Sequence, residues 1–172
     1  MTLSIAEAKR FGFAPYLPVA LARPRVESCR EIYQRNRHRV YSLAFWMTDN
    51  ELTAEELMTR AFYRAFDRGE EPTADDIDRA LISELRDRFP LGSLTLNCSP
   101  CERVLSIRCN TLRVDLERAV VQLPPTEKLM FLMHDVEDYD HDRIARLLGT
   151  TEDESRCGVH QARLRLRELL AK

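Results

Sequence analysis

The sequence has little glycine, no long hydrophobic run and almost no net charge. Five glycines occur among 172 residues, and they form no glycine-rich loop of the kind that cradles a phosphate group. No stretch approaches the roughly 20 apolar residues that cross a membrane, and the N-terminus lacks the apolar core of a signal peptide. We therefore predict a cytoplasmic protein without membrane insertion.

The lack of a charge bias and of catalytic motifs narrows the functional classes. The formal net charge is −2, so any contact with DNA must come from local segregation of charge. The sequence contains neither the H-E-x-x-H of zinc proteases nor the G-x-S-x-G of serine hydrolases. We expect a protein that is not an enzyme, with no catalytic residues and no cofactor.

The five cysteines are expected to be reduced thiols. Cys98 and Cys101 form a single CxxC pair, and a zinc or redox site that adds Cys109 and either His134 or His141 is the less favoured alternative. The acidic segment 135–142 is more typical of a capped, solvated loop than of a magnesium site. We therefore expect no metal.

The residues that are abundant favour helices. Apolar residues recur at three- and four-residue intervals, and no stretch alternates like a β-strand. The pattern predicts an all-α fold of two small helical domains joined by a linker, with a helix-turn-helix in the C-terminal domain. Helices are expected at 26–47, 54–66, 73–89, 105–120, 125–136, 140–148 and 152–170. The side chains expected to face inward in three of them are Ile77, Leu81 and Leu85, then Leu105, Leu112, Leu116, Ala119 and Val120, and then Leu129, Leu132, Met133 and Val136. The expected divisions are an N-terminal arm (1–24), a first domain (25–90), a linker (91–103) and a C-terminal domain (104–172).

Two local signals define the ends of these helices. Thr53, with Glu56 three residues later, suggests a capping box, and Leu52 and Leu57 are spaced for a hydrophobic staple. In the C-terminal domain, the apolar face of Ile144, Ala145 and Leu148 is followed by Gly149, which can adopt the left-handed conformation of a tight turn. A short helix, this turn and a longer helix make a helix-turn-helix, whose second helix can enter the major groove of DNA.

The motifs around the helix-turn-helix resemble the C-terminal domain of bacterial RNA polymerase sigma factors of the extracytoplasmic-function (ECF) type. The matching residues are Leu123-Pro124-Pro125, Phe131-Leu132, Ile144-Ala145-Arg146-Leu147-Leu148-Gly149, His160-Gln161-Ala162-Arg163 and Leu166-Arg167. The N-terminal half is similar to the first domain of the same family through Tyr33, Arg39-Val40-Tyr41, Leu43-Ala44, Met47, Ala54-Glu55-Glu56-Leu57, Phe62 and Arg64-Ala65-Phe66. The resemblance covers residues 28–90 and 112–170.

The resemblance implies the partners and the residues that meet them. In this family the first domain docks on core RNA polymerase and reads the minus-ten promoter element, and the C-terminal domain reads the minus-thirty-five element. An anti-sigma factor that covers the first-domain helices is a further expected partner. The expected polymerase-binding residues are Glu55, Glu56, Leu57, Arg60, Phe62 and Phe66. The expected DNA-binding residues are Arg79, Arg86, Arg88, Arg156, His160, Gln161, Arg163, Arg165 and Arg167.

The segment that opens promoter DNA in this family is degenerate here. The corresponding stretch, ADDIDRALISELRDRF, has no Trp, Tyr or Asn, and it begins with Asp75, Asp76 and Asp78. Aromatic stacking on an unpaired base is worth about 1–3 kcal/mol, and this stretch offers only Phe89 for it. Arg60 also reverses a charge that the family uses against a basic partner.

The last helix combines an acidic start with a basic remainder. Glu152, Asp153 and Glu154 suit the positive end of the helix dipole, with Thr151 and Glu154 as a capping box, but carboxylates there repel phosphates. The helix then either reads DNA through its middle or does not bind DNA. In that middle, Gln161 can read adenine and an arginine can read guanine, whereas Gly158 offers nothing to a base. His160 is either a half-buried helix residue or a base contact, and Arg165 and Arg167 either face phosphates or only solvent.

Two further hypotheses stand beside the leading one of an ECF-type sigma factor. The first is a sigma-like interaction protein that binds polymerase or an anti-sigma factor without reading a promoter. The second is a free-standing helix-turn-helix regulator, which would bind duplex DNA with a steep salt dependence.

Overall fold

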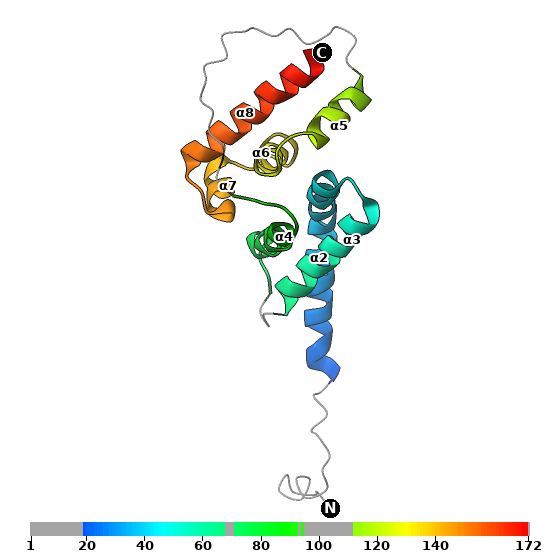
Figure 1. Cartoon of the computed structure of the whole chain (residues 1–172). Coiled ribbons are helices and arrows are strands. Elements are labelled where there is room, and N and C mark those ends of the chain that lie inside the picture. The colour runs from blue at the N-terminus through cyan, green and yellow to red at the C-terminus, as the bar shows by residue number, and fades with distance from the viewer. Residues whose placement is uncertain (1–18, 68–70, 93, 95–111, 172) are drawn as a thin grey trace, which may run out of the picture.

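The N-terminal half folds around one long helix, α2 (Val19–Thr48). The computed structural model describes residues 19–67, 71–92, 94 and 112–171, with the backbone alone for 19–27. Helices α3 (Glu51–Phe66) and α4 (Ala74–Arg88) pack on each other and on α2, whose first turns extend beyond them (Figure 1). The long helix begins at Val19 rather than at 26, so the expected 1–24 arm overlaps it. Residues 1–18 lie outside the described ranges.

The cap of α3 differs from the sequence prediction. Asn50, not Thr53, is the N-cap, because its backbone is extended and its side-chain oxygen accepts a hydrogen bond from the backbone N–H of Thr53 at 2.9 Å. The helix therefore starts earlier, and Leu52 falls in its first turn with 79% of its surface exposed. The predicted staple between Leu52 and Leu57 is wrong for the same reason.

The start of α4 is a capping box that the sequence patterns did not predict. Thr73 accepts a hydrogen bond from the backbone N–H of Asp76, and the Asp76 carboxylate accepts one in return from the backbone N–H of Thr73. Ile77, Leu81 and Leu85 are buried on one face, as their spacing predicted. Asp78 is buried beside them, which the apolar spacing did not predict.

The C-terminal half is built from shorter helices. Its elements are α5 (Arg113–Val121), α6 (Pro125–Phe131), the π-helical segment η2 (Leu132–Val136), α7 (His141–Leu148) and α8 (Glu152–Ala171). Helix α8 packs on α5, α6 and α7, so it forms the spine of this half (Figure 1). Leu129, Leu132 and Met133 are buried there, as predicted.

Two expectations for this half are wrong. Leu112 and Leu116 were expected to face inward, but they are 66% and 43% exposed, because α5 buries only its end, at Ala119 and Val120. Val136 was expected to face inward and is 49% exposed. The α-helical phase that predicted its burial stops at Phe131, and the wider π-helical turn of η2 rotates the following residues away from the core.

The predicted helix-turn-helix is present as α7, a tight turn and α8. Gly149 ends α7 with φ 71° and ψ 35°, the left-handed conformation that its position predicted. Thr151 and Glu154 form the predicted capping box at the start of α8: the Glu154 backbone N–H donates to the Thr151 hydroxyl at 3.1 Å, and the Thr151 N–H donates to the Glu154 carboxylate at 2.7 Å. The all-α prediction is confirmed for the described residues, which contain no strand.

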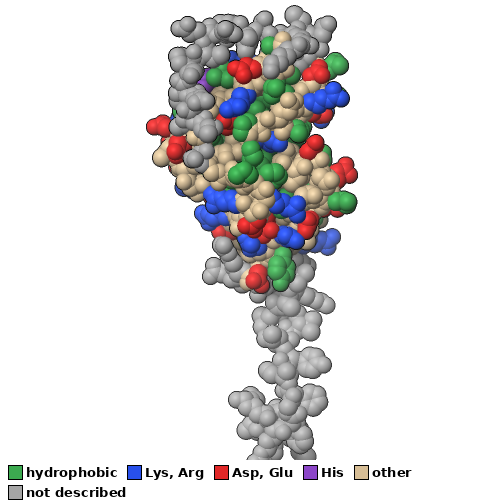
Figure 2. Space-filling view, viewed as in Figure 1, with side chains coloured by type: hydrophobic (Ala, Val, Ile, Leu, Met, Phe, Trp, Pro, Cys, Tyr) green, Lys and Arg blue, Asp and Glu red, His purple; other side chains and the backbone are tan. Residues whose placement is uncertain are grey.

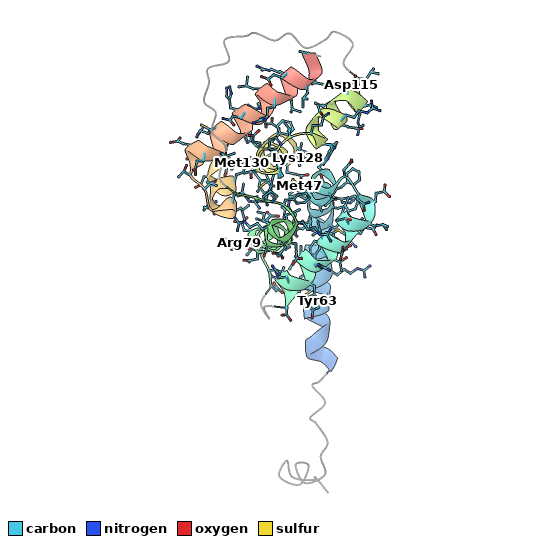
Figure 3. All side chains as sticks on the ribbon, in the orientation of Figure 1. Met47, Tyr63, Arg79, Asp115, Lys128 and Met130 are labelled. Atoms are coloured by element: carbon cyan, nitrogen blue, oxygen red, sulfur yellow. The ribbon has the colours of Figure 1, made fainter. Side chains whose placement is uncertain are left out.

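The two halves contact each other directly. Helix α4 packs on α7, and α2 packs on α5, α6 and η2, so one hydrophobic core runs through both halves. Met47 of α2 lies with Lys128 and Met130 of α6 in the middle of the molecule (Figure 3). Most of the expected 91–103 linker lies outside the described residues, so its role as a flexible tether stays a prediction.

Candidate functional site

The exposed face of α8 carries a basic stripe. Arg156, His160, Arg163 and Arg167 are all exposed and recur at intervals of three and four residues, which places them on one side of the helix. The opposite side packs into the core through Val159, Ala162 and Leu166. Gln161 lies at the edge and is half-buried. The helix therefore presents most of its predicted DNA-binding side chains together.

Carboxylates already pair with two of the three arginines in this stripe. Arg156 pairs with Glu152 one turn earlier, and Arg163 makes two hydrogen bonds to Asp135, at 2.9 and 2.5 Å. The bonds to Asp135 raise the pKa of Arg163. Among the described residues, no ion pair engages Arg167. A phosphate group that binds here must compete with protein carboxylates for two of the three arginines.

Arg165 differs from the arginines of the stripe. Its Nε lies 2.8 Å from the Oε2 atom of Glu127, whose side chain is almost fully buried in α6. Burial raises the pKa of Glu127, and the nearby Arg165 charge opposes that rise. Truncating Arg165 would leave a carboxylate buried without its partner. This residue holds α8 on α6, and its predicted role in DNA contact stays untested.

A pair of stacked histidines lies beside the start of α8. The rings of His134 and His141 are 4.3 Å apart, and the His141 ring bonds the Ser155 hydroxyl of α8 at 3.1 Å. Burial lowers the pKa of His141, and His134 and the cations Arg156 and Arg163 lower it further, against a smaller opposing effect of Glu152. The neutral histidine is therefore the form that this position favours.

The predicted polymerase-binding residues divide into a buried and an exposed set. Leu57 and Phe62 are 1% and 4% exposed, because they form the face of α3 that packs on α2 and α4. Neither side chain is open to a partner in this conformation, and their expected role in polymerase binding stays a prediction. Phe66 is half-buried and stacks on Phe62 at 6.0 Å. Glu55 and Glu56 are exposed on the outer face, where a partner can reach them.

Arg60, whose positive charge departs from the family pattern, is neutralised by ion pairs within the protein. Its guanidinium lies 2.7 Å from Glu56 and 4.0 Å from Glu84 of α4. Arg64 joins the same group at 3.1 Å from Glu84. With the exposed Tyr63, these side chains line a shallow groove between α3 and α4. Figure 3 shows Tyr63 at the periphery of the molecule.

The predicted DNA-binding arginines of α4 are engaged within the protein. Arg79 lies 3.0 Å from Asp76, and Arg88 lies 2.9 Å from Glu56 of α3. Arg86 donates a hydrogen bond at 2.6 Å to the backbone carbonyl of Leu148 in α7. Arg79 remains at the surface (Figure 3), whereas the contact of Arg86 ties α4 to the helix-turn-helix.

The acidic start of α4 has partners that sequence reasoning missed. Asp78 accepts hydrogen bonds from Arg39 of α2 and from Tyr139 and Arg143 of the C-terminal half. Burial raises the pKa of Asp78, and Arg39, Tyr139 and Arg143 oppose that rise. Its position on the apolar face of α4, next to Ile77, was the one available signal that it would be buried and paired.

Other candidate sites gain no support from the described residues. Within them, no three His, Cys, Asp or Glu side chains gather where they could hold a metal ion, and Cys98, Cys101 and Cys109 lie outside. In the acidic segment 135–142, Asp140 caps α7 and Asp142 pairs with Arg146.

Acidic and basic side chains are interspersed around a hydrophobic band on the face seen in Figure 2, without a large field of either sign. Each helix that the structure describes is too short or too polar to cross a lipid bilayer.

Comparison with known proteins places the C-terminal half in a class. Residues 113–166 match the family model described as sigma-70, region 4, which spans α5 to most of α8. The chain is also similar to the ECF RNA polymerase sigma factor SigE of Mycolicibacterium smegmatis, with 26% identity over 157 residues. That match covers 83% of the chain, and the chain spans about 61% of the relative's length. Together the two matches confirm the resemblance to ECF-type sigma factors that the motifs predicted.

Proposed function

We propose that this protein is a sigma factor of the ECF type, which binds core RNA polymerase and directs transcription initiation at specific promoters. The observation that carries the proposal is the sigma-70 region 4 match over a helix-turn-helix whose second helix has an exposed basic stripe. The protein would act where the polymerase is, in the cytoplasm, without catalysis of its own.

The stripe of α8 is the proposed surface for the minus-thirty-five element. Arg156, His160, Arg163 and Arg167 are exposed along it, and Gln161 borders it. A helix that lies in the major groove contacts base edges and phosphates through such a stripe. Arg167 makes no ion pair within the described residues, so it is the arginine of the stripe that need not break an existing ion pair to bind a phosphate.

The outer face of α3 is the proposed polymerase-binding surface. Glu55 and Glu56 point outward from it, and the buried Leu57 and Phe62 hold the helix in place. Arg60, already paired with Glu56 and Glu84, contributes little free positive charge against a basic partner. An anti-sigma factor that competes with the polymerase would cover the same face.

Run-off transcription tests the proposal. Core RNA polymerase is incubated with genomic promoter fragments, with and without the protein, and initiation that depends on the protein is the expected result. Arg167→Ala should weaken promoter binding and reduce the salt slope by about one unit, as loss of one phosphate contact does. Arg113→Ala is the matched control, since Arg113 is exposed and its ion pair among the described residues is with Glu117 of the same helix. No initiation from any template would contradict the proposal.

A second candidate function is a sigma-like interaction protein that binds polymerase or an anti-sigma factor without reading a promoter. The engaged arginines of α4 favour it: Arg86 bonds to α7 and Arg88 pairs with α3, so neither is free to meet DNA in this conformation. Polymerase binding without initiation in the same assay would support this alternative.

A further inference from the structure

The outer face of α2 carries cations that the rest of the fold leaves unpaired. Arg30, Arg35 and Arg37 are exposed there, and His38 lies beside them. Among the described residues, no carboxylate forms an ion pair with these three arginines. In α4 and α8, by contrast, most arginines already pair with carboxylates. Glu31 is the single acid between residues 28 and 48. This face of α2 can therefore accept phosphate groups without breaking existing ion pairs.

The same helix supplies three aromatic rings at the end of the basic stretch. Tyr41, Phe45 and Trp46 are half-buried. The Tyr41 and Phe45 rings stack with their centres 6.1 Å apart, and the Phe45 and Trp46 rings meet edge to face at 6.1 Å. Arg37, Tyr41 and Phe45 follow one another at four-residue intervals, which places them along one side of the helix. All three rings line a groove of about 660 Å³, the aromatic groove, so the cations lead along α2 to a set of rings.

Helix α5 forms the opposite wall of the aromatic groove, beside the C-terminal end of α2 (Figure 1). Val114, Arg118 and Val121 line this wall. Arg118 is exposed, and no ion pair engages it among the described residues. The hydrophobic core that spans both halves includes Met47 of α2 and Val120 of α5, so it holds the two walls in place. The aromatic groove is therefore already formed in the unliganded protein.

Two carboxylates line the aromatic groove, and each already faces a cation. Glu117 pairs with Arg113 at 2.8 Å. Asp49 faces the buried Lys128: burial lowers the pKa of Lys128, and the Asp49 charge opposes that change. Neither carboxylate leaves an uncompensated negative charge that would repel a phosphate group.

Cations next to aromatic rings are the combination that binds a single-stranded polynucleotide. Arginines bind the phosphates, and the rings stack on unpaired bases. Bases in a duplex already stack on their neighbours, so they cannot reach half-buried rings. From Arg30 to Phe45 the helix rises about 22 Å at about 1.5 Å per residue. That length accommodates about six nucleotides at about 3.4 Å each, whereas a mononucleotide would leave most of it unused.

We propose that the outer face of α2, from Arg30 to the aromatic groove, is a binding site for single-stranded DNA. The choice of DNA rests on the proposed function, because a sigma factor meets an opened promoter strand. The site is separate from α4 and α8, the two helices to which the family resemblance assigns DNA contact. It supplies the aromatic rings that the degenerate segment in α4 lacks.

Binding of a labelled oligodeoxythymidylate of about ten nucleotides to the full chain tests the site. Trp46 is the single tryptophan and lines the aromatic groove, so its fluorescence should be quenched in step with binding. Contacts from Arg30, Arg37 and Arg118 should give a salt slope of about −2, at about 0.7 per phosphate. The same strand annealed to its complement should leave Trp46 fluorescence unchanged. No quenching by the single strand, or equal quenching by the duplex, would overturn the proposal.

Two variants locate the contact. Arg37→Ala changes an exposed side chain and should weaken binding and reduce the salt slope by about 0.7. Phe45→Leu keeps an apolar side chain but removes the ring, so binding should weaken about fivefold or more, with unchanged helical circular dichroism. Arg167→Ala, at an exposed arginine of α8, is the matched control and should bind the single strand like the wild type. Wild-type affinity in both Arg37→Ala and Phe45→Leu would contradict the assignment.

The outcomes separate this site from the proposed function, because the binding assay contains no polymerase. Absence of single-strand binding, with initiation intact in the run-off assay, would overturn the site and leave the sigma-factor proposal standing. Failure of all initiation, with single-strand binding as expected, would overturn the proposed function while the site remains. Tighter binding of an oligouridylate RNA of the same length would overturn the assignment to DNA.

Discussion

At the scale of single residues, the side chains that contact a residue in the fold determine its role, which the residue type alone left open. Asp78 was seen as a negative charge in a segment that should meet DNA, and the structure buries it against two arginines and a tyrosine. Leu57 and Phe62 match a docking motif, yet they pack inside the first half. Residue identity limited what each side chain could do, and the neighbours determined what it does here.

Gly158 shows the same point for a residue without a side chain. From the sequence it was only a position that offers nothing to a base, but a Cβ at this position would lie 2.4 Å from the sulfur of Met130 and 3.2 Å from Leu94. Gly158→Val should lower the free energy of unfolding by about 1–3 kcal/mol through overpacking, measured by urea denaturation. Gly92→Val is the control, since nothing lies within 4 Å of that position. Equal stability of the two variants would show that Met130 moves aside at no cost.

The histidine pair predicts a pH dependence. Because the pKa of His141 is lowered in the folded protein, the unfolded chain binds more protons, and stability is lost as the pH falls below the ordinary histidine value of 6.5. Thermal unfolding between about pH 7.5 and pH 5 should show a smaller acid loss for His141→Gln than for the wild type. His38→Gln, at an exposed position of α2, should behave like the wild type. An unchanged acid loss in His141→Gln would assign it to other groups.

At the scale of elements, short-range sequence patterns predicted most of the helices. They did not predict where a helix starts earlier or changes its helical geometry. The capping box of α8 and the left-handed Gly149 depend on neighbours within a few residues, so the sequence predicted them. The earlier cap of α3 at Asn50 and the π-helical turn of η2 depend on how the chain settles against other helices. That turn alone moved Val136 from the expected core to the surface.

The acidic start of α8 can be tested as an element. Glu152 and Asp153 are both exposed, and Glu152 pairs with Arg156. Glu152→Gln with Asp153→Asn removes two charges that repel phosphates and frees Arg156. Affinity for promoter DNA should rise, with a salt slope steeper by about 0.9 for one added phosphate contact. The control is Glu168→Gln, an exposed acid at the far end of α8. Unchanged affinity in a titration would show that this helix end lies away from DNA.

At the scale of the whole molecule, the shared core predicts cooperative unfolding. Trp46 is the single tryptophan and lies in the N-terminal half, so its fluorescence reports mainly on that half, whereas circular dichroism reports on helices of both. The two urea transitions of the wild type should coincide, because one hydrophobic core spans both halves. Arg143→Glu should separate the two transitions, because it replaces the ion pair between Arg143 and Asp78, which joins the halves, with a repulsion between carboxylates. Separate transitions in the wild type would show that the halves unfold independently.

The sequence by itself determined the helical class, the helix-turn-helix and the likeness to ECF-type sigma factors. These rest on periodicity, caps and motifs, which act over a few residues and are readable without the fold. Only the tertiary structure decided which charges meet. Asp78 and Arg143 are 65 positions apart, and their contact depends on how α4 docks against α7. No local pattern encodes that docking, because it is set by the packing of apolar faces on several helices at once.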